Sequence, residues 1–248
     1  PMANDRKTAL ITGAGQNIGK ACALALARNG FNIVINGRSQ REQCDDVADQ
    51  VQRMGPDALV AMGDVGSREG CEAVVAPALE RFGRIDVMVH NAALRPSSPF
   101  LEMNEDDWHN IHNVNMNASF WLARLTLPGM VEAGWGRIIN IAGMNAMHGY
   151  NGRAHVSTSK HGNWGLTKAL AKEFGSKGIT VNLVSPGPIR PENDDPKQMA
   201  HHGEQLARIP VGRLGEPNEV AAVVALLASD EGAFINGQMI QVNGGMMT

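Results

Sequence analysis

The sequence predicts an α/β fold in which a parallel sheet of about seven strands carries helices on both faces. Short apolar runs of strand length alternate along the chain with stretches that repeat apolar residues at helical spacing. The first apolar run is followed by closely spaced glycines and then by a helical pattern. Because repeated strand–helix–strand units build parallel sheets, this order predicts a doubly wound, Rossmann-like arrangement.

Length and composition predict one domain that acts on a small molecule. The 248 residues are enough for one large α/β domain over 1–248 and few for two. Lys and Arg number 22 against 25 Asp and Glu, a formal charge of −3, which favours neither nucleic acid nor an anionic membrane as partner. The apolar runs are strand-sized and no basic-flanked apolar leader is visible, so we expect a cytoplasmic protein without a membrane span.

Residues 7–20 are typical of a strand, a phosphate-binding loop and the start of a helix. Gly13 and Gly15 can adopt backbone conformations that a Cβ would forbid, and Gly19 lets the helix start lie close to the strand. The free N–H groups of such a loop, with the helix dipole behind them, suit an anion. The sequence therefore predicts a pyrophosphate site here.

The remaining elements are predicted from apolar periodicity and glycine or proline boundaries. Further strands are expected at 31–36, 57–62, 84–90, 136–142, 178–184 and 237–242, and helices at 17–30, 40–54, 67–82, 105–131, 157–174 and 217–228.

The end of the second predicted strand bears on the choice of cofactor. A carboxylate there would bind the adenosine ribose hydroxyls and repel a 2′-phosphate. Gly37 occupies the position instead, and Arg38 offers a guanidinium fork suited to a phosphate, with Ser39 beside it. We therefore expect NADP(H) in preference to NAD(H), the alternative being that Arg38 is a solvated surface residue.

Cysteine and histidine spacing predicts neither a disulfide framework nor a metal site. Cys22, Cys44 and Cys71 fall on predicted helices without close spacing. His109 and His112 lie one helical turn apart, but no third ligand follows at a spacing typical of metal sites.

The spacing Thr12-Gly-x-Gly-x-x-x-Gly19, with Ile18 before the last glycine, resembles the cofactor loop of the short-chain dehydrogenase/reductase family. The resemblance covers nearly the whole chain and implies an NADP(H)-dependent oxidoreductase acting on a small carbonyl or alcohol substrate. It implies a substrate lid near 190–212, and it gives Asn115 a place in a proton relay to the active-site lysine through a kinked helix. The cofactor-binding residues that it implies are Gly13, Gly15, Asn17, Ile18, Gly19, Arg38, Ser39, Asp64, Val65, Asn91, Ala92, Lys160, Pro186, Gly187 and Ile189.

The family's catalytic serine and tyrosine are missing. Aligning Ser159-Lys160 with the family's Ser-Lys pair puts Val156 in the place of the tyrosine and Gly143 in the place of the serine. Tyr150 is the single tyrosine of the chain, so no shift of register can build Tyr-x-x-x-Lys. The adenosine half of the site is thus expected to be intact and the reactive half altered.

Several residues are candidates to replace the missing phenol. His155 has a suitable ordinary pKa of about 6.5, but it would face the site only if its helix began after it. Tyr150 and His148 lie in a glycine-containing loop that could fold over the substrate, and Lys160 could exchange protons itself if its pKa fell far enough.

Three classes of function remain open at this point. They are an oxidoreductase with a substituted acid/base, a non-redox lyase, hydrolase or isomerase, and a nucleotide-binding subunit or sensor without catalysis. For the first class we expect poor reduction of ordinary ketones. The change of Val156→Tyr with Gly143→Ser is expected to improve it, at little packing strain.

The predicted helix at 105–131 also suggests self-association. It carries Phe120, Trp121, Leu122, Leu125 and Leu127, a pattern too apolar for one buried stripe. In the family this helix contributes to subunit contacts, so we expect a homotetramer or homodimer.

Overall fold

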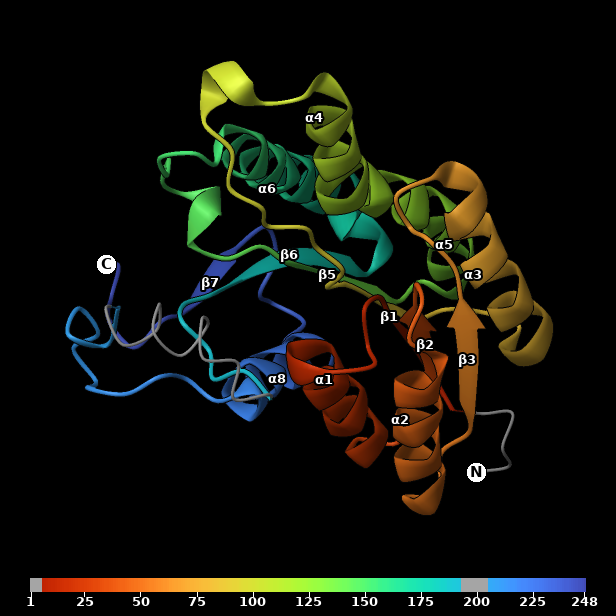
Figure 1. The fold of residues 1–248 in the computed structure, drawn as a ribbon. Coiled ribbons are helices and arrows are strands. Elements are labelled where there is room, and N and C mark those ends of the chain that lie inside the picture. The colour runs from red at the N-terminus through yellow and green to blue at the C-terminus, as the bar shows by residue number, and fades with distance from the viewer. Residues whose placement is uncertain (1–5, 193–204) are drawn as a thin grey trace.

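The computed structural model describes residues 6–192 and 205–248, which form a seven-stranded sheet in the order β3-β2-β1-β4-β5-β6-β7 (Figure 1). All neighbouring strands are parallel. The strands are β1 (Thr8–Ile11), β2 (Asn32–Gly37), β3 (Ala58–Met62), β4 (Val87–His90), β5 (Gly136–Ile141), β6 (Ile179–Pro186) and β7 (Met239–Val242). The predicted doubly wound parallel sheet is confirmed.

The side chains of the strands contribute to two layers of the hydrophobic core, one on each face of the sheet. Ile11 and Ile33 belong to one cluster of buried apolar residues, whereas Leu10 and Val34, next to them in sequence, belong to another. Successive side chains of a strand point to opposite faces, so a strand that is apolar at every position needs cover on both faces.

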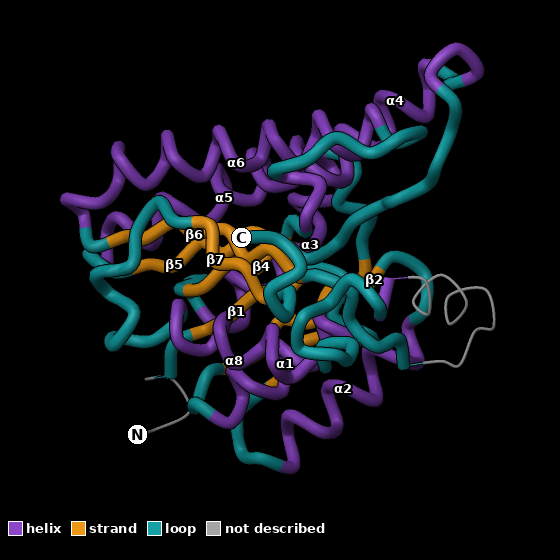
Figure 2. Tube along the Cα trace, turned by 90° about the vertical axis from the view of Figure 1, so that its left-hand side faces the viewer, coloured by secondary structure: helices purple, strands orange, loops and turns teal. Residues whose placement is uncertain are grey.

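Helices provide this cover on each side of the sheet (Figure 2). The first layer consists of α1 (Asn17–Arg28), α2 (Arg41–Arg53) and α8 (Pro217–Leu227), and the second of α3 (Arg68–Phe82), α4 (Glu105–His112), α5 (Ala118–Ala133) and α6 (Ala154–Phe174). Three 3₁₀ turns, η1 (Phe100–Glu102), η3 (Met144–Ala146) and η4 (Gly175–Lys177), lie in the connections. Most predicted helix bounds hold to within a few residues.

The predicted helix at 105–131 is interrupted. After α4, the stretch η2 (Asn113–Asn117) is π-helical, and α5 begins at Ala118. Apolar periodicity does not reveal such an insertion, because the residues on both sides keep helical spacing.

The π-helical stretch leaves main-chain carbonyls open to side-chain donors. The carbonyl of Val114 accepts a hydrogen bond from Nε2 of His90 at 3.0 Å, which fixes the proton on that nitrogen. The carbonyl of Asn115 accepts one from Nδ2 of Asn163 at 3.3 Å. The interruption is therefore tied both to β4 and to α6.

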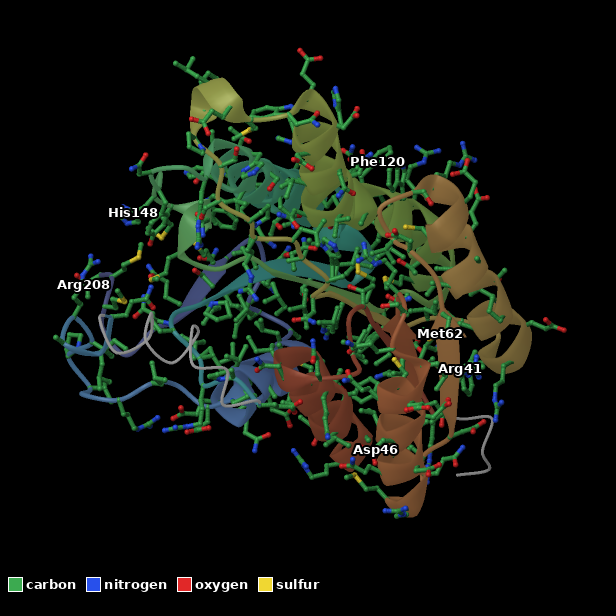
Figure 3. All side chains as sticks on the ribbon, viewed as in Figure 1. Arg41, Asp46, Met62, Phe120, His148 and Arg208 are labelled. Carbon is green, nitrogen blue, oxygen red and sulfur yellow. The ribbon has the colours of Figure 1, made fainter. Side chains whose placement is uncertain are left out.

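The apolar residues of α5 mostly serve the core. Leu122 and Leu127 are buried, and Trp121 and Leu125 pack against the same cluster. Phe120 is 45% exposed and points away from the sheet at the outer surface (Figure 3). Packing within the chain therefore covers two of the five apolar residues fully and two in part, and leaves Phe120 exposed.

The order of the strands places a crevice where the functional loops meet. The connections of β1 and β4 lead to opposite faces of the sheet, which opens a crevice at the carboxyl ends of these strands. Of the predicted lid at 190–212, residues 193–204 lie outside the described residues. Within the part of the chain that the structure describes, no helix combines the length and the apolar character needed to cross a membrane.

Candidate active site

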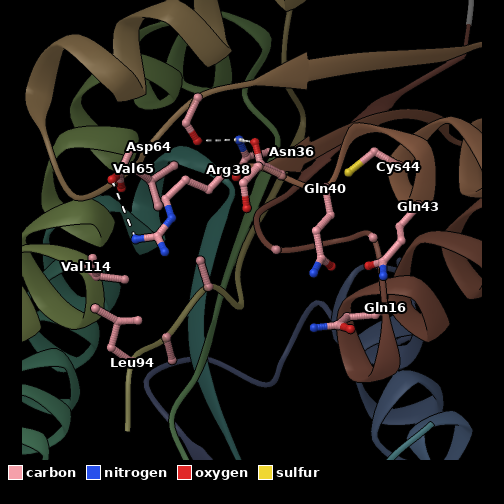
Figure 4. Close-up of a pocket in the computed structure, with 17 residues that line it drawn as sticks. Gln16, Asn36, Arg38, Gln40, Gln43, Cys44, Asp64, Val65, Leu94 and Val114 are labelled. Atoms are coloured by element: carbon pink, nitrogen blue, oxygen red, sulfur yellow. Dashed lines mark hydrogen bonds and ion pairs between the residues drawn. The ribbon is translucent and has the colours of Figure 1, made fainter. Parts of the chain in front are cut away.

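Two adjoining cavities open at the carboxyl ends of the strands. The β2-side cavity of about 300 Å³ lies beyond β1, β2 and β3 (Figure 4), and the β5-side cavity of about 520 Å³ lies beyond β1, β5 and β6. Gly13, Gln16, Ala92 and Ala93 line both cavities, so the two meet at the turns after β1 and β4. This is the crevice in which doubly wound sheets bind dinucleotides.

All of the predicted cofactor-binding residues lie in the walls of these cavities. Those of the β2-side cavity are Gly13, Gly15, Arg38, Ser39, Asp64, Val65 and Ala92. Those of the β5-side cavity are Gly13, Asn17, Ile18, Gly19, Asn91, Ala92, Lys160, Pro186, Gly187 and Ile189. The fold therefore gathers residues from separate parts of the chain around one crevice.

The loop after β1 has the geometry of an anion-binding turn. Gly13 has φ of +61°, and a Cβ on Gly19 would collide with the carbonyl oxygen of Gly13. Asn17 also has positive φ, which asparagine tolerates better than most residues, and its buried Oδ1 has no hydrogen-bond partner among the described residues. Because a buried amide oxygen requires a donor, this atom in the wall of the β5-side cavity fits a hydroxyl- or amide-bearing ligand.

The end of β2 presents a cation and excludes a carboxylate. Nη1 of Arg38 lies 3.9 Å from Oδ2 of Asp64 across the β2-side cavity, and both side chains are more than half exposed (Figure 4). Such a long, solvated pair contributes little stability, so the guanidinium remains available to a phosphate. A Cβ on Gly37 would lie 2.5 Å from Sγ of Cys44, so no side chain fits there unless Cys44 moves.

Lys160 is a buried amine in the wall of the β5-side cavity. The residue is 1% exposed, and Nζ donates a hydrogen bond to the carbonyl oxygen of Ile141 at 2.9 Å. Burial, and to a lesser degree the charge of Arg95, lower the pKa of Lys160 to about 7. The amine can therefore gain and lose a proton near neutral pH.

Asn115 lines neither cavity, but its side chain forms hydrogen bonds with the loop after β4. Its Oδ1 accepts a hydrogen bond from the N–H of Leu94 at 2.8 Å, and its Nδ2 donates to the carbonyl of Leu94 at 2.9 Å. The same Nδ2 lies 3.2 Å from Oγ of Ser159 on α6. The predicted kink is present, and the main-chain carbonyl of Asn115 within it accepts a hydrogen bond from Asn163.

His155 is turned away from both cavities. Because α6 begins at Ala154, His155 lies inside the helix, and the condition for it to face the site is not met. Its Nδ1 accepts a hydrogen bond from the N–H of Val156, and its pKa is lowered by burial and then raised in part by Asp107 of α4. His155 itself lines neither cavity.

The other loop candidates also lie outside the cavity walls. Tyr150 is 38% exposed, and His148 lies at the outer surface (Figure 3). Neither lines the β5-side cavity. Of the four residues proposed from the sequence to replace the phenol, the structure brings only Lys160 to the cavity wall.

Two arginines that no sequence motif pointed to also line the β5-side cavity. Arg95 follows the turn after β4, and Arg153 directly precedes α6. Both arginines lie close in sequence to recognised motifs, which was the available sign that they belong to the site. The sequence alone does not show that their two loops lie side by side in the fold. Within residues 6–192 and 205–248, no three His, Cys, Asp or Glu side chains are grouped so as to hold a metal ion.

Comparisons with known proteins agree with this geometry. A family model described as enoyl-(acyl carrier protein) reductase matches residues 13–247. The chain belongs to the short-chain dehydrogenase/reductase family. It is 34% identical over 240 residues to the 3-oxoacyl-[acyl-carrier-protein] reductase FabG of Staphylococcus aureus, with 97% of this chain and 98% of the relative covered.

Further members of the family show how far the similarity extends. FabG of Vibrio cholerae is 37% identical over 243 residues, which cover 97% of each chain. The crystal structure of the acetoin dehydrogenase YohF from Salmonella typhimurium superposes with a TM-score of 0.90 at 33% identity, covering 98% of this chain and 96% of that one. The chain is thus an oxidoreductase of the short-chain type.

Position 143, where the family places its serine, is constrained by the backbone. Gly143 has φ of +103° and ψ of 174°, a combination that is essentially restricted to glycine. A Cβ there would find room, because its nearest neighbour would be the carbonyl oxygen of Pro186 at 3.7 Å. The expectation that Gly143→Ser causes little packing strain therefore holds, but the substitution meets a backbone cost that the sequence did not reveal.

We predict that Gly143→Ser lowers the free energy of unfolding by about 1–3 kcal/mol, the cost of holding a non-glycine residue in this conformation. Gly149→Ser in the same loop is the control, because Gly149 is exposed, has no positive φ and would bring no atom within 4 Å of its Cβ. Urea denaturation of the three proteins measures the difference. Equal losses in the two variants would contradict the explanation.

Proposed function

We propose that this protein is an NADP(H)-dependent oxidoreductase that interconverts a small carbonyl compound and its alcohol, with Lys160 as the group that exchanges the proton. The observation that supports this most is the buried amine of Lys160 in the wall of the β5-side cavity. Among the described residues of that wall, the other ionisable side chains are Arg95 and Arg153, which remain protonated near neutral pH. Lys160 is therefore the proton carrier available, and the expected place of action is the cytoplasm.

Residues of both cavities would contribute to binding the cofactor. The glycine loop after β1 would hold the cofactor's phosphates, Oδ1 of Asn17 would accept a hydrogen bond from a hydroxyl or amide group of the cofactor, and Arg38 would bind a 2′-phosphate. A bound nicotinamide supplies or accepts the hydride.

Lys160 would then handle the proton. In reduction the ammonium form gives a proton from Nζ to the carbonyl oxygen of the substrate, and in oxidation the neutral amine takes it back. Burial makes the ammonium a stronger acid than an exposed lysine. The names of the relatives include reductases of an oxo group and dehydrogenases of acetoin, which supports a carbonyl or alcohol substrate.

The first test is the pH dependence of the reaction. The pKa of Lys160 is lowered to about 7, so the proton is held below that pH and lost above it. We predict that kcat/KM for carbonyl reduction at saturating NADPH falls toward alkaline pH, and that kcat/KM for alcohol oxidation rises. Lys160→Met should lose roughly a hundred- to ten-thousandfold in rate, the usual contribution of acid–base catalysis.

A control separates loss of chemistry from loss of binding. NADPH affinity of the wild type and Lys160→Met is measured by fluorescence at each pH, because a lysine in this wall can also contact the cofactor. A kcat/KM that does not change between pH 6 and 9 would contradict the proposed role of Lys160 in proton transfer. Binding of NADPH without turnover of any carbonyl would overturn the redox proposal and favour the non-redox or non-catalytic alternatives.

The second test concerns the cofactor. We predict that NADPH binds at least tenfold more tightly than NADH, since a charge-assisted guanidinium–phosphate bond contributes about 1.5–3 kcal/mol. Arg38→Ala should remove most of the difference. Arg41→Ala is the matched control, because Arg41 lies on nearby α2 and lines neither cavity. Equal affinities for the two cofactors in the wild type would defeat the prediction.

The third test concerns assembly, for which we propose a homotetramer or homodimer. The exposed ring of Phe120 on α5 is the feature of the predicted contact helix that packing within the chain leaves uncovered. Light scattering at micromolar concentration should show more than one subunit, and Phe120→Asp should shift the mass toward the monomer. A wild-type monomer would contradict the proposal.

A further inference from the structure

The β5-side cavity carries three cationic side chains, two of which have no place in the proposed proton transfer. Lys160, Arg95 and Arg153 all line it. No Asp or Glu among the described residues contributes to its wall. The cavity is therefore a positively charged space next to the proposed reaction site.

The two segments that carry these arginines contact each other. Nε of Arg153 donates a hydrogen bond to Oγ of Ser97 at 3.1 Å, and the N–H of Ser98 donates to the carbonyl of Gly152 at 2.8 Å. Arg95 comes directly after Leu94, whose main chain is held by Asn115. The segment after β4 and the loop before α6 thus lie side by side, and both Arg95 and Arg153 line the β5-side cavity.

The charges of this wall are not neutralised by the described part of the protein. Neither Arg95 nor Arg153 has a carboxylate within ion-pair distance there, whereas Arg81, Arg84 and Arg213 all do. Desolvation and then the charge of Arg153 lower the pKa of Arg95, and Arg95 in turn lowers that of Lys160. Arg95 is exposed and Arg153 partly buried, so solvent screens part of the repulsion between these like charges, and an anion would relieve the remainder.

We infer that the substrate carries an anionic group, a carboxylate or a phosphate, which Arg95 and Arg153 bind in the β5-side cavity. The inference rests on the proposed function, because it names the substrate class of that site. Paired guanidinium forks suit the planar oxygens of a carboxylate and those of a phosphate. Such an anion would also favour the ammonium form of Lys160, so that the substrate's own charge would help to keep the proton donor protonated.

The test compares carbonyl compounds that differ only in charge. One pair is 4-oxopentanoate and its methyl ester, and the other is dihydroxyacetone phosphate and dihydroxyacetone. Calorimetric titration in the presence of NADP⁺ measures binding without turnover, because an oxidised cofactor cannot reduce a ketone. The charged member of at least one pair should bind about ten- to hundredfold more tightly than its neutral partner, and the pair that shows it distinguishes carboxylate from phosphate.

Substitutions connect this preference to the two arginines. Arg95→Gln and Arg153→Gln should each remove most of the difference in affinity between charged and neutral ligands. Arg153→Lys should retain part of that difference, because the positive charge remains. Arg124→Gln on the outer part of α5 is the control and should leave it unchanged. Equal binding of charged and neutral members in the wild type would overturn the inference.

Two further outcomes separate this inference from the proposed function. If NADPH reduces neutral ketones and the anions bind no better, the inference fails alone. If no carbonyl is reduced but the anions bind through both arginines, the redox proposal fails and the anion site stands. If the glutamine variants instead lose NADP⁺ affinity and keep the preference for anions, the arginines belong to the cofactor and the inference is overturned.

Discussion

The two hydrogen bonds between the Asn115 side chain and the main chain of Leu94 fix the loop after β4 at the candidate active site. They satisfy a backbone N–H and a backbone C=O in a loop that belongs to no regular element. Both groups are partly buried, so leaving them unpaired would carry part of the roughly 1–3 kcal/mol cost of an unsatisfied buried group. The side chain also bonds to Ser159, so one amide connects the interrupted helix, the segment after β4 and α6.

The hydrogen bonds of Asn115 help to position two of the cationic side chains of the β5-side cavity. Arg95 follows Leu94 in the chain, and Lys160 follows Ser159, so the residues that Asn115 bonds are the neighbours of two cations of the β5-side cavity. A buried ammonium is costly unless hydrogen bonds compensate for lost hydration, and for Lys160 the carbonyl of Ile141 provides one such bond. The remaining cost appears as the lowered pKa.

The two halves of the crevice differ in how far they follow the family pattern. The β2-side cavity is lined by the glycine turn, by Arg38 at the end of β2 and by Asp64 and Val65. The β5-side cavity has Gly143 in a conformation that resists a side chain, and the fully buried Val156 lines neither space. The two departures from the family pattern thus coincide with a restricted backbone at Gly143 and a fully buried side chain at Val156.

Periodicity and turn chemistry act over a few residues, which is why the sequence alone determined the sheet, most helices and the loops around the cofactor crevice. Tertiary structure decided which candidate reaches the cavity, since whether His155 or Lys160 faces it depends on where α6 begins and on what packs against it. It also decided the conformation at Gly143 and the placement of Arg95 and Arg153 around one cavity, because these depend on contacts between segments far apart in the chain. Local pattern predicts elements, whereas the charge and reactivity of a site arise from what the fold brings together.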